Sequence, residues 1–595
     1  MSEITPITEW PAYEDNPFGG DPVTQNLNVP YDKGDLCWLL VATIICWQIT
    51  PAIGFLYAGM HRRKSALTMV FQSLFCASAC GIQFWVYGYS LYQSHTTGPG
   101  WGDLSLAGLH NVGAQPSLAN SGIPDILYAA FGMTFVTATA MILAGAMLER
   151  GRLFPSMVFL LCWTTFVYYV LAYWEWNPSG WLYKLGVYDF AGSGPVHIAS
   201  GFGALAWSIM LGPRVRHEEE AATASNTATT TTTTTTAAAN SSSPATASGE
   251  MTPPAAQPEG AEKTAATTAK PRRQHVQPHN PFLVGLGTVF IWFGWFAFNG
   301  ASTANLSLRS IYVVVNTNLA ACGGGLAWSA LEYVHEHLHS RKRQNNIGSS
   351  AAGDATGGTA SPASGGGGGG SIDGFNTTAS GGKFSIVGFC SGIIAGLVGI
   401  TPAAGYVPVY TAALVGALTA VCSFYVVRHK HRLVIRGRAV DDGLDIFAIH
   451  GVGGVVGDIL TGFFAATFVP ALDGASGSTY AGGWWERNWV QMGYQLAAAL
   501  TCAAWSFVVS CLLLFIIDKI PGLHLRATEE EELRGLDFKY LSDSTFSGGG
   551  GGVHGDEEEG LRRWYAVQAY EGVPVPVNVA MPSPADAKGI EVKRD

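Results

Sequence analysis

Long apolar runs separated by short polar loops dominate this chain of 595 residues. A helix needs roughly 20 apolar residues to cross a hydrocarbon core of about 30 Å. Eleven runs are long enough, and they start near Leu36, Ala66, Asp125, Leu153, Pro195, Pro281, Ser310, Phe384, Val407, Asp445 and Asn488. The pattern therefore predicts an all-α polytopic membrane protein with eleven transmembrane helices.

The loops between these runs differ in charge. Basic clusters occur in every second loop, and they are HRRK at 61–64, ERGR at 149–152, PRVRH at 213–217, SRKR at 340–343 and RHKHRLVIRGR at 428–438. The alternate loops, such as 95–124, contain almost no Lys or Arg. Because basic loops face the cytoplasm, we expect the N-terminus outside and the C-terminus inside.

Three polar segments interrupt the apolar pattern: 217–278 with its run of threonines, 344–382, and the glycine- and glutamate-rich 544–560. Such compositions bury too little apolar surface to fold, so we expect them to be disordered. The expected organisation is an extracellular segment 1–34, a first five-helix repeat 35–216, the insert 217–278, a second five-helix repeat 279–470 that contains the insert 344–382, an eleventh helix with its preceding loop 471–518, and a cytoplasmic tail 519–595.

Composition agrees with a membrane protein. Hydrophobic residues make up 48% of the chain and charged residues only 13%, whereas soluble domains carry about 25% charged residues. The formal net charge of −10 comes largely from the segments outside the apolar runs, which argues against nucleic-acid binding. The ten cysteines lie in or beside apolar runs without a CxxC pair. We interpret them as packing residues and expect neither disulfides nor a metal site.

Two histidines stand at corresponding places in the chain. His197 opens the fifth apolar run, and His450 lies near the start of the tenth. Ten spans that divide five and five place the second half upside down relative to the first. The expected architecture is thus a 5+5 inverted repeat plus one helix, in which the two histidines approach each other near the membrane midplane.

Six motifs in order along the chain carry a family resemblance. They are GDLCWLL…GFLYAGMHRRKSAL, FGMTFVTATAMILAGAMLERGR, YDFAGSGPVHIASG, IWFGWFAFNGASTAN, GLVGITPAAGYV and DDGLDIFAIHGVGGVVGDILTGFFA. The sequence resembles the ammonium transporter (Amt/Mep/Rh) family, and is most similar to its fungal ammonium-permease branch. The resemblance covers about residues 33–540. It implies a plasma-membrane homotrimer of eleven-helix protomers, each with its own narrow pore for ammonium and methylammonium and without a cofactor.

The resemblance implies an outer cation site at Phe135, Trp176 and Ser302, with Trp174 and Trp181 as the alternatives to Trp176. Ring faces and a hydroxyl oxygen can replace part of the water around a cation. Below this site the family has stacked phenyl rings, which would here be Phe131 and Phe298. The competing interpretation is that aromatic residues four apart simply pack in a helix interface.

The resemblance assigns His197 and His450 to the pore. A neutral imidazole has one donor and one acceptor, so a facing pair can take a proton from ammonium and guide ammonia through an apolar lumen. The alternative is a pair of packing histidines. A zinc centre would need a third or fourth ligand, which speaks against a metal.

Two further elements are assigned by position. Asp189 precedes the fifth run, where it can attract cations or, as we favour, cap a helix whose first N–H groups need an acceptor. In the tail, Gly535, Leu536 and Asp537 match a family element that docks under the pores and regulates them. Ser542, Ser544 and Thr545 follow, where a kinase could add a phosphate that repositions the tail.

Three classes of function fit a membrane protein with these features. A transporter is favoured, and a receptor that senses ammonium, with or without transport, is second because permeases of this branch that keep both histidines are associated with signalling. An intramembrane enzyme is third, and the lack of a third His, Cys or acidic ligand within the spans argues against it. We therefore expect a transporter and not an enzyme.

Overall fold

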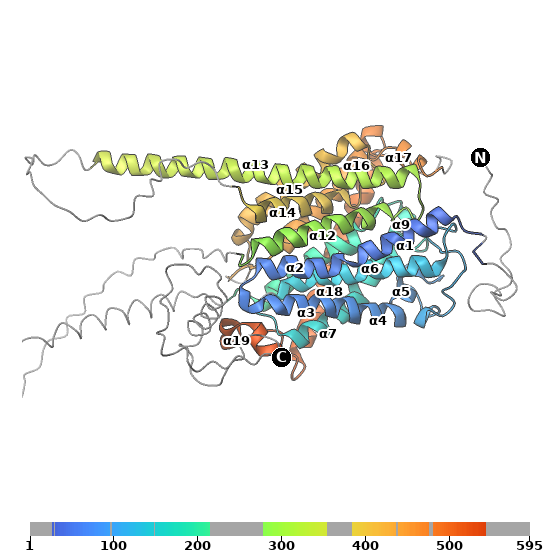
Figure 1. Cartoon of the computed structure of the whole chain (residues 1–595), viewed down its shortest axis with the longest axis horizontal. Helices are drawn as coiled ribbons and strands as arrows, with labels where there is room; N and C mark the ends of the chain where they lie inside the picture. Colours follow the sequence, from blue (N-terminus) through green and yellow to red (C-terminus); the bar gives the residue numbers. More distant parts are fainter. Residues whose placement is uncertain are drawn as a thin grey trace, which may run out of the picture. The chain divides into compact units, whose positions relative to one another are not determined.

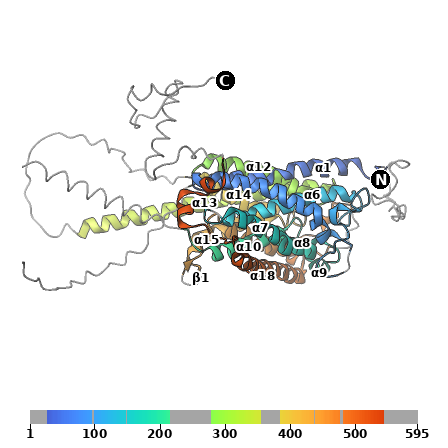
Figure 2. The same cartoon turned by 90° about the horizontal axis from the view of Figure 1, so that it is seen from below.

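The helices of this chain lie side by side in one bundle (Figures 1 and 2). A computed structural model describes residues 27–28, 30–95, 98–147, 149–214, 278–353, 384–435, 438–474 and 480–542. The start of the expected extracellular segment, nearly all of the insert 217–278, residues 354–382 and the tail beyond Ser542 lie outside these described residues.

The first half contributes five spanning stretches. Their elements are α1 (Lys33–Trp47) and α2 (Ile49–Met60); η1 (Arg63–Ser65), α3 (Ala66–Phe75), η2 (Cys76–Cys80), α4 (Gly81–Gln83), η3 (Phe84–Gly88) and α5 (Tyr89–Gln93); α6 (Asp125–Ala144) and η5 (Gly145–Met147); α7 (Leu153–Trp163), η6 (Thr164–Tyr168), α8 (Tyr169–Trp176) and α9 (Trp181–Leu185); η7 (Ser193–Ile198) and α10 (Ala199–Leu211). The short turn η4 (Ala107–Leu109) lies in a connecting loop.

The second half repeats this organisation and adds one helix. Its spanning elements are α12 (Pro281–Gly300), α13 (Leu308–Gly353), α14 (Ile386–Ile400), α15 (Val409–His429), η10 (Phe447–Val452) with α16 (Gly453–Phe464), and α18 (Trp489–Lys519). The connecting and tail elements are η9 (Lys430–Arg432), β1 (Val434–Ile435), β2 (Arg438–Ala439), α17 (Phe468–Ala471), η11 (Trp484–Glu486), α19 (Glu529–Arg534) and α20 (Leu536–Tyr540). Within the described residues, β1 and β2 form one antiparallel hairpin in which Val434 pairs with Ala439.

The predicted membrane spans are present. Within the described residues, ten stretches are long and apolar enough to cross a membrane. The remaining predicted span, expected from Phe384, is the shorter apolar helix α14, which has 15 residues. The protein is therefore an all-α polytopic membrane protein, as its hydrophobic pattern predicts. All ten of its cysteines are free.

Local sequence explains where several helices begin. Asp32 accepts hydrogen bonds from Gly34 N and Asp35 N at the start of α1. Asn280 accepts one from Leu283 N, and Pro281 is the first residue of α12. A side-chain acceptor satisfies N–H groups that have no partner in the first helical turn, and proline fits the first position because its missing N–H is not needed there.

Glycines set the spacing between helices. A Cβ on Gly287 of α12 would overlap the backbone of Leu56 in α2. Gly324 of α13 approaches Gly392 and Gly396 of α14 in the same way, and Gly416 of α15 approaches Ala320. Membrane helices lack a hydrophobic driving force between them and associate through such close backbone packing.

One expected boundary is wrong. The second insert was expected to begin at 344, but α13 continues as helix to Gly353. The sequence from 340 to 353, SRKRQNNIGSSAAG, contains no proline, and its first half is rich in Arg, Lys and Gln. These residues propagate a helix once it has been nucleated, and the apolar part of α13 supplies the nucleus, so the helix continues although Asn, Ser and Gly follow.

Candidate functional site

The two histidines lie in equivalent local structures. His197 belongs to η7 and His450 to η10, and both elements are π-helical turns that precede an α-helix. Such turns occur frequently at functional sites. Asp189 caps the first of them through Gly192 N and Ser193 N at 2.9 and 2.6 Å. Asp442 caps the second through Ile446 N and Phe447 N at 3.1 and 3.0 Å.

The histidine-bearing helices cross where no side chain fits between them. A Cβ on Gly201 would overlap the backbone nitrogen of Gly451. Beside this crossing, Nδ1 of His197 and Nδ1 of His450 are 3.3 Å apart, and the ring centroids are 5.3 Å apart. Both residues are buried. A shared hydrogen bond requires one ring to donate from Nδ1 and the other to accept there.

Trp295 is a neighbour of His197 that sequence reasoning missed. Its ring stacks on the imidazole with centroids 5.3 Å apart and an interplanar angle of 17°. The indole Nε1 donates to Thr401 Oγ1 at 3.0 Å, which fixes the ring. Trp295 stands three residues before Phe298 on α12, and residues three apart share a helix face. This spacing from Phe298 is the sequence feature that could have identified Trp295 as a neighbour of the histidines.

Aromatic rings continue from Trp295 in one direction. Trp295 contacts Phe298 with centroids 5.6 Å apart, and Phe298 stacks on Phe135 at 3.9 Å and 21°. Trp176 contacts the edge of Phe135 at 5.9 Å. The rings thus form a column from Trp176 to His450, with contributions from α8, α6, α12, η7 and η10.

The column corrects one expectation. Phe131 was expected to stack on Phe298, but Phe135 occupies that position, and Phe131 contacts Phe135 edge-on at 4.9 Å. Residues four apart lie on the same helix face, so the sequence does not determine which of the two rings is level with Phe298. Phe135 consequently contacts both Trp176 and Phe298.

The structure shows which of the three candidate tryptophans contacts the aromatic column. Trp176 is partly exposed and contacts Phe135. Trp174 packs against Trp181 and Trp505, and its Nε1 donates to the carbonyl of Gly100 at 2.5 Å. Of these tryptophans, Trp176 is therefore the one that joins the column.

Ser302 lies one turn beyond Phe298 on the chain. Its hydroxyl donates to the Phe298 carbonyl at 2.8 Å, and the side chain is partly exposed. Because the proton is used in this bond, the oxygen presents lone pairs that can accept an N–H group.

The Gly-Leu-Asp element of the tail is docked on the loop before α3. Asp537 accepts hydrogen bonds from Leu67 N, Thr68 N and Thr68 Oγ1 at 3.0, 2.7 and 2.7 Å. Leu536 is buried. Gly535 has a φ of 102° and lies against the Lys64 carbonyl. Asp537 thus serves as an acceptor for the first turn of a helix that is 470 residues away in the sequence.

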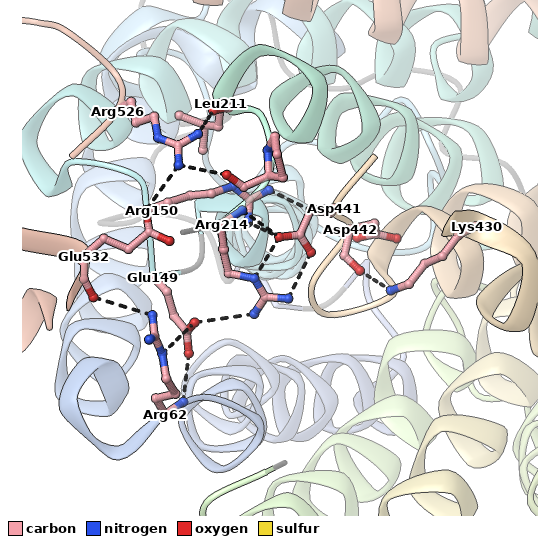
Figure 3. Close-up of polar contacts among 11 residues, drawn as sticks. Arg62, Glu149, Arg150, Leu211, Arg214, Lys430, Asp441, Asp442, Arg526 and Glu532 are labelled. Carbon is pink, nitrogen blue, oxygen red and sulfur yellow. Dashed lines mark hydrogen bonds and ion pairs between the residues drawn. The ribbon is translucent and has the colours of Figure 1, made fainter. Parts of the chain in front are cut away.

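Charged side chains connect four cytoplasmic segments beside this tail (Figure 3). Glu149 Oε2 pairs with Arg62 Nε at 2.9 Å and with Arg214 Nη1 at 3.4 Å, and Arg214 Nε pairs with Asp441 Oδ2 at 2.8 Å. Burial opposes ionisation of Glu149, but Arg214 and the other basic groups around it outweigh burial and lower the pKa of its carboxyl group to about 2.

The tail joins the same network through Arg526. Its guanidinium donates to the carbonyl of Pro213 at 2.8 Å and to that of Leu211, and pairs with Glu532 Oε2 at 3.2 Å. Leu211 is the last residue of α10, the helix that follows His197. The tail therefore contacts the cytoplasmic end of a histidine-bearing helix.

Fold and geometry together define a class of protein. The protein is a polytopic bundle in which a column of aromatic rings leads to two buried imidazoles that can be neutral. These are the features of a membrane transporter for a small solute. The family model described as Ammonium Transporter Family matches residues 37–237, 263–361 and 344–546. The chain belongs to this family, whose members are transporters and not enzymes.

Similar proteins agree with this assignment. Ammonium transporter 1 of Schizosaccharomyces pombe is 40% identical over 546 residues, which cover 92% of this chain and 88% of that protein. Ammonium transporter MEP2 of Saccharomyces cerevisiae is 36% identical, with 89% and 86% covered. The crystal structure of Candida albicans Mep2 is similar with a TM-score of 0.66 and 37% identity, and the match covers 86% of this chain and 90% of that chain.

Proposed function

We propose that the aromatic column is the path of ammonium transport. Trp176, Phe135 and Ser302 recruit the cation at the outer end, the stacked Phe135 and Phe298 close the path, and His197 with His450 relays a proton and guides ammonia inward. Each protomer of a plasma-membrane homotrimer carries one such path, and methylammonium uses it as well.

Energetics support this division of work. A charge at the bilayer centre costs about 2.5–3.5 kcal/mol even on the mild insertion scale. A cation over a ring gains roughly 0.5–1 kcal/mol when exposed and about 2 kcal/mol or more when desolvated. The rings therefore offset part of the cost at the mouth, and transfer of the proton to an imidazole removes the remaining cost for ammonia.

The observation that carries the proposal is the contact between the column and the histidine pair. Trp295 joins the two by touching both Phe298 and His197. In addition, His197 Nε2 is buried without a hydrogen-bond partner among the described residues. A relay needs a ring nitrogen that is left for the permeating molecule, and Nε2 of His197 meets this requirement.

Substitution of His197 tests the proposal. His197→Ala removes the relay and is expected to reduce methylammonium uptake about 100-fold, the lower range for loss of an acid–base group. His197→Glu keeps a proton acceptor and is expected to retain some uptake with an altered pH dependence. Ser200→Ala, one turn further along, is the control, because among the described residues the Ser200 hydroxyl donates only to backbone carbonyls of its own helix, those of Val196 and His197.

The outcome separates relay from packing. If His197 only packs, Ala lowers the amount of trimer and Glu abolishes folding by burying an unpaired charge. Wild-type uptake by both assembled variants across the pH range would exclude His197 from the path. A receptor that senses ammonium without transport would show no methylammonium uptake even in the wild type.

The docked tail supports a regulatory role for Gly535, Leu536 and Asp537. A phosphate on Ser542 would add negative charge to the chain five residues after Asp537. We expect a cytoplasmic kinase or signalling partner to act there. Ser544 and Thr545, the other candidates, lie outside the described residues.

A further inference from the structure

Three carboxyl groups lie together behind the outer end of the aromatic column. They belong to Glu175 at the end of α8, Asp189 before η7 and Asp458 in α16, and their side chains interact with one another. The three residues are 6%, 9% and 1% exposed. Among the described residues, none of the three takes part in an ion pair. Three negative charges would therefore repel one another in a site that water does not screen.

The hydrogen bonds indicate which group is ionised. Asp189 accepts three backbone N–H groups, two at Oδ1 and one from Gly194 at Oδ2 at 3.1 Å. Bonds of this kind stabilise the carboxylate form. The Glu175 carboxyl group lies against the same Gly194, since a Cβ on that residue would overlap Glu175 Oε1. Two carboxylates have no hydrogen to share, so a hydrogen bond between these neighbouring groups needs the proton on Glu175.

The remaining contacts of Glu175 agree with a neutral acid. Its Oε1 accepts from Cys502 Sγ at 3.1 Å, whereas Oε2 is buried and has no donor among the described residues. Burying a carboxylate oxygen that accepts no hydrogen bond costs free energy. If Oε2 instead carries the proton, it can donate a hydrogen bond to Asp189. Besides Asp189 and Asp458, Cys502 of α18 is the titratable group that faces Glu175.

Glu175 also contacts the helix that carries His197. A Cβ on Gly194 would overlap the Glu175 carboxyl group, and Gly194 is three residues before His197. On its other side, Glu175 is followed directly by Trp176 of the outer site. Its carboxyl group thus lies between the outer aromatic site and the first turn of the His197 helix.

We propose that Glu175 is a protonated positioning residue that donates its hydrogen to Asp189, and thereby holds a single negative charge and the cap of η7 in place at the outer end of the path. Ionised Glu175 would place a second negative charge against Asp189 and weaken the bonds that Asp189 makes to the start of η7. Its effect on uptake rests on the proposed function, but its protonation does not.

Infrared spectroscopy of the protein in liposomes tests the protonation directly. A protonated carboxyl group has a carbonyl band that shifts in heavy water. The wild-type-minus-variant spectrum is expected to show this band for Glu175→Gln and to lack it for Asp189→Asn, because Asp189 carries the single negative charge. A difference spectrum without the band for Glu175→Gln, or a band for Asp189→Asn alone, overturns the proposal.

Uptake tests the positioning role. In Glu175→Gln the amide donates the same hydrogen bond, so the methylammonium concentration at half-maximal uptake is expected to stay within about twofold of wild type. Glu175→Leu lacks the donor and is expected to raise this concentration about tenfold. Equal values for Gln and Leu in assembled trimers overturn the role. If the wild type transports no methylammonium, the proposed function fails while the infrared result still decides on the proton.

Discussion

Phe131 and Phe135 occupy one face of α6 but have different neighbours. Phe135 stacks on Phe298 and contacts Trp176, whereas Phe131 touches only the edge of Phe135 among the rings described. Their spacing of four residues predicted the shared face, and that prediction is confirmed. The level of each ring along the path depends on how α6 is shifted relative to α12, and this shift is set by tertiary packing that the sequence pattern does not encode.

This difference predicts unequal effects of the two rings. Phe135→Ala removes one ring of the stack and an edge of the outer site, so we expect it to raise half-saturation for methylammonium and to weaken discrimination against potassium. Phe131→Ala removes an aromatic contact worth about 0.5–1.5 kcal/mol, and we expect a smaller change in uptake. Uptake kinetics of both variants, normalised to the trimer recovered, make the comparison. Equal kinetics would assign the two rings the same role.

The histidine pair was accessible from sequence because two independent facts point to it. His197 and His450 are ionisable residues in apolar runs, and they stand at equivalent places in two repeats. Their proximity is confirmed by the distance of 3.3 Å between the ring nitrogens. Trp295 was not found because tryptophan is common in membrane helices and only its spacing from Phe298 marks it.

At the scale of elements, hydrophobic runs predicted helices but not the wider turns within them. Both histidines lie in π-helical turns, whose apolar pattern over six residues is too short to distinguish from an α-helix. Each turn is preceded by a capping aspartate, Asp189 or Asp442. The preference for a capping role of Asp189 agrees with its three backbone contacts.

Docking of the tail depends on Asp537. In Asp537→Ala the first turn of α3 loses its side-chain acceptor, which costs about 1 kcal/mol, so we expect the equilibrium constant for docking of the tail to fall roughly fivefold. Limited trypsin digestion of the purified protein measures this through cleavage at Arg534 and Lys539. Those sites should be cut faster in the variant.

The control for this experiment is Glu530→Ala. Glu530 is exposed, and among the described residues its ion pair is with Arg534 on its own short helix, so its loss should leave cleavage at Lys539 unchanged. Identical digestion of the Asp537 variant and the wild type would show that other contacts, such as those of Arg526, are sufficient to hold the tail.

At the scale of the whole molecule, the positions of the membrane spans followed from the sequence alone. Long apolar runs have few alternatives in a bilayer, because backbone groups must be hydrogen-bonded within the helix. The end of α13 could not be predicted in the same way. Its last residues are polar, so the apolar pattern stops before the helix does, and only the extension of an existing helix carries it to Gly353.

The polar inserts are expected to be dispensable for assembly. Replacing 217–277 or 354–382 with a short polar linker leaves every described helix intact, so the trimer and methylammonium uptake should be retained. Size-exclusion chromatography and uptake of the two deletion variants provide the test. Loss of the trimer would show that an insert is structural, and loss of uptake from an intact trimer would show that it regulates.

Acid should destabilise the cytoplasmic face. His61 is fully buried between Glu149 and the neighbouring basic groups, and burial lowers its pKa from 6.5 to about 3. The unfolded chain therefore binds a proton that the folded protein does not. Stability should fall as the pH drops below about 6.5, by about 1.4 kcal/mol per unit for this group. Below about 4.5, protonation of Glu149 in the unfolded state adds to the loss.

Thermal unfolding of the solubilised trimer between pH 7 and pH 4 measures this effect. His61→Leu removes the titrating group and should flatten the dependence between pH 6.5 and pH 4.5. His110→Leu replaces an exposed histidine and should change nothing. An unchanged slope in the His61 variant would assign the acid sensitivity to other groups.

The glycine crossing of the two histidine-bearing helices has a mechanical consequence. At Gly201 and Gly451 the two backbones are in contact. This contact is the natural pivot point for a rigid-body rotation of one helix relative to the other. His197 is four residues from it, about 6 Å along the axis, whereas Leu211 is ten residues away, about 15 Å. If the tail displaces Leu211, the rotation moves the cytoplasmic end of α10 further than it moves His197. The distance between the two imidazoles then changes less than the position of Leu211.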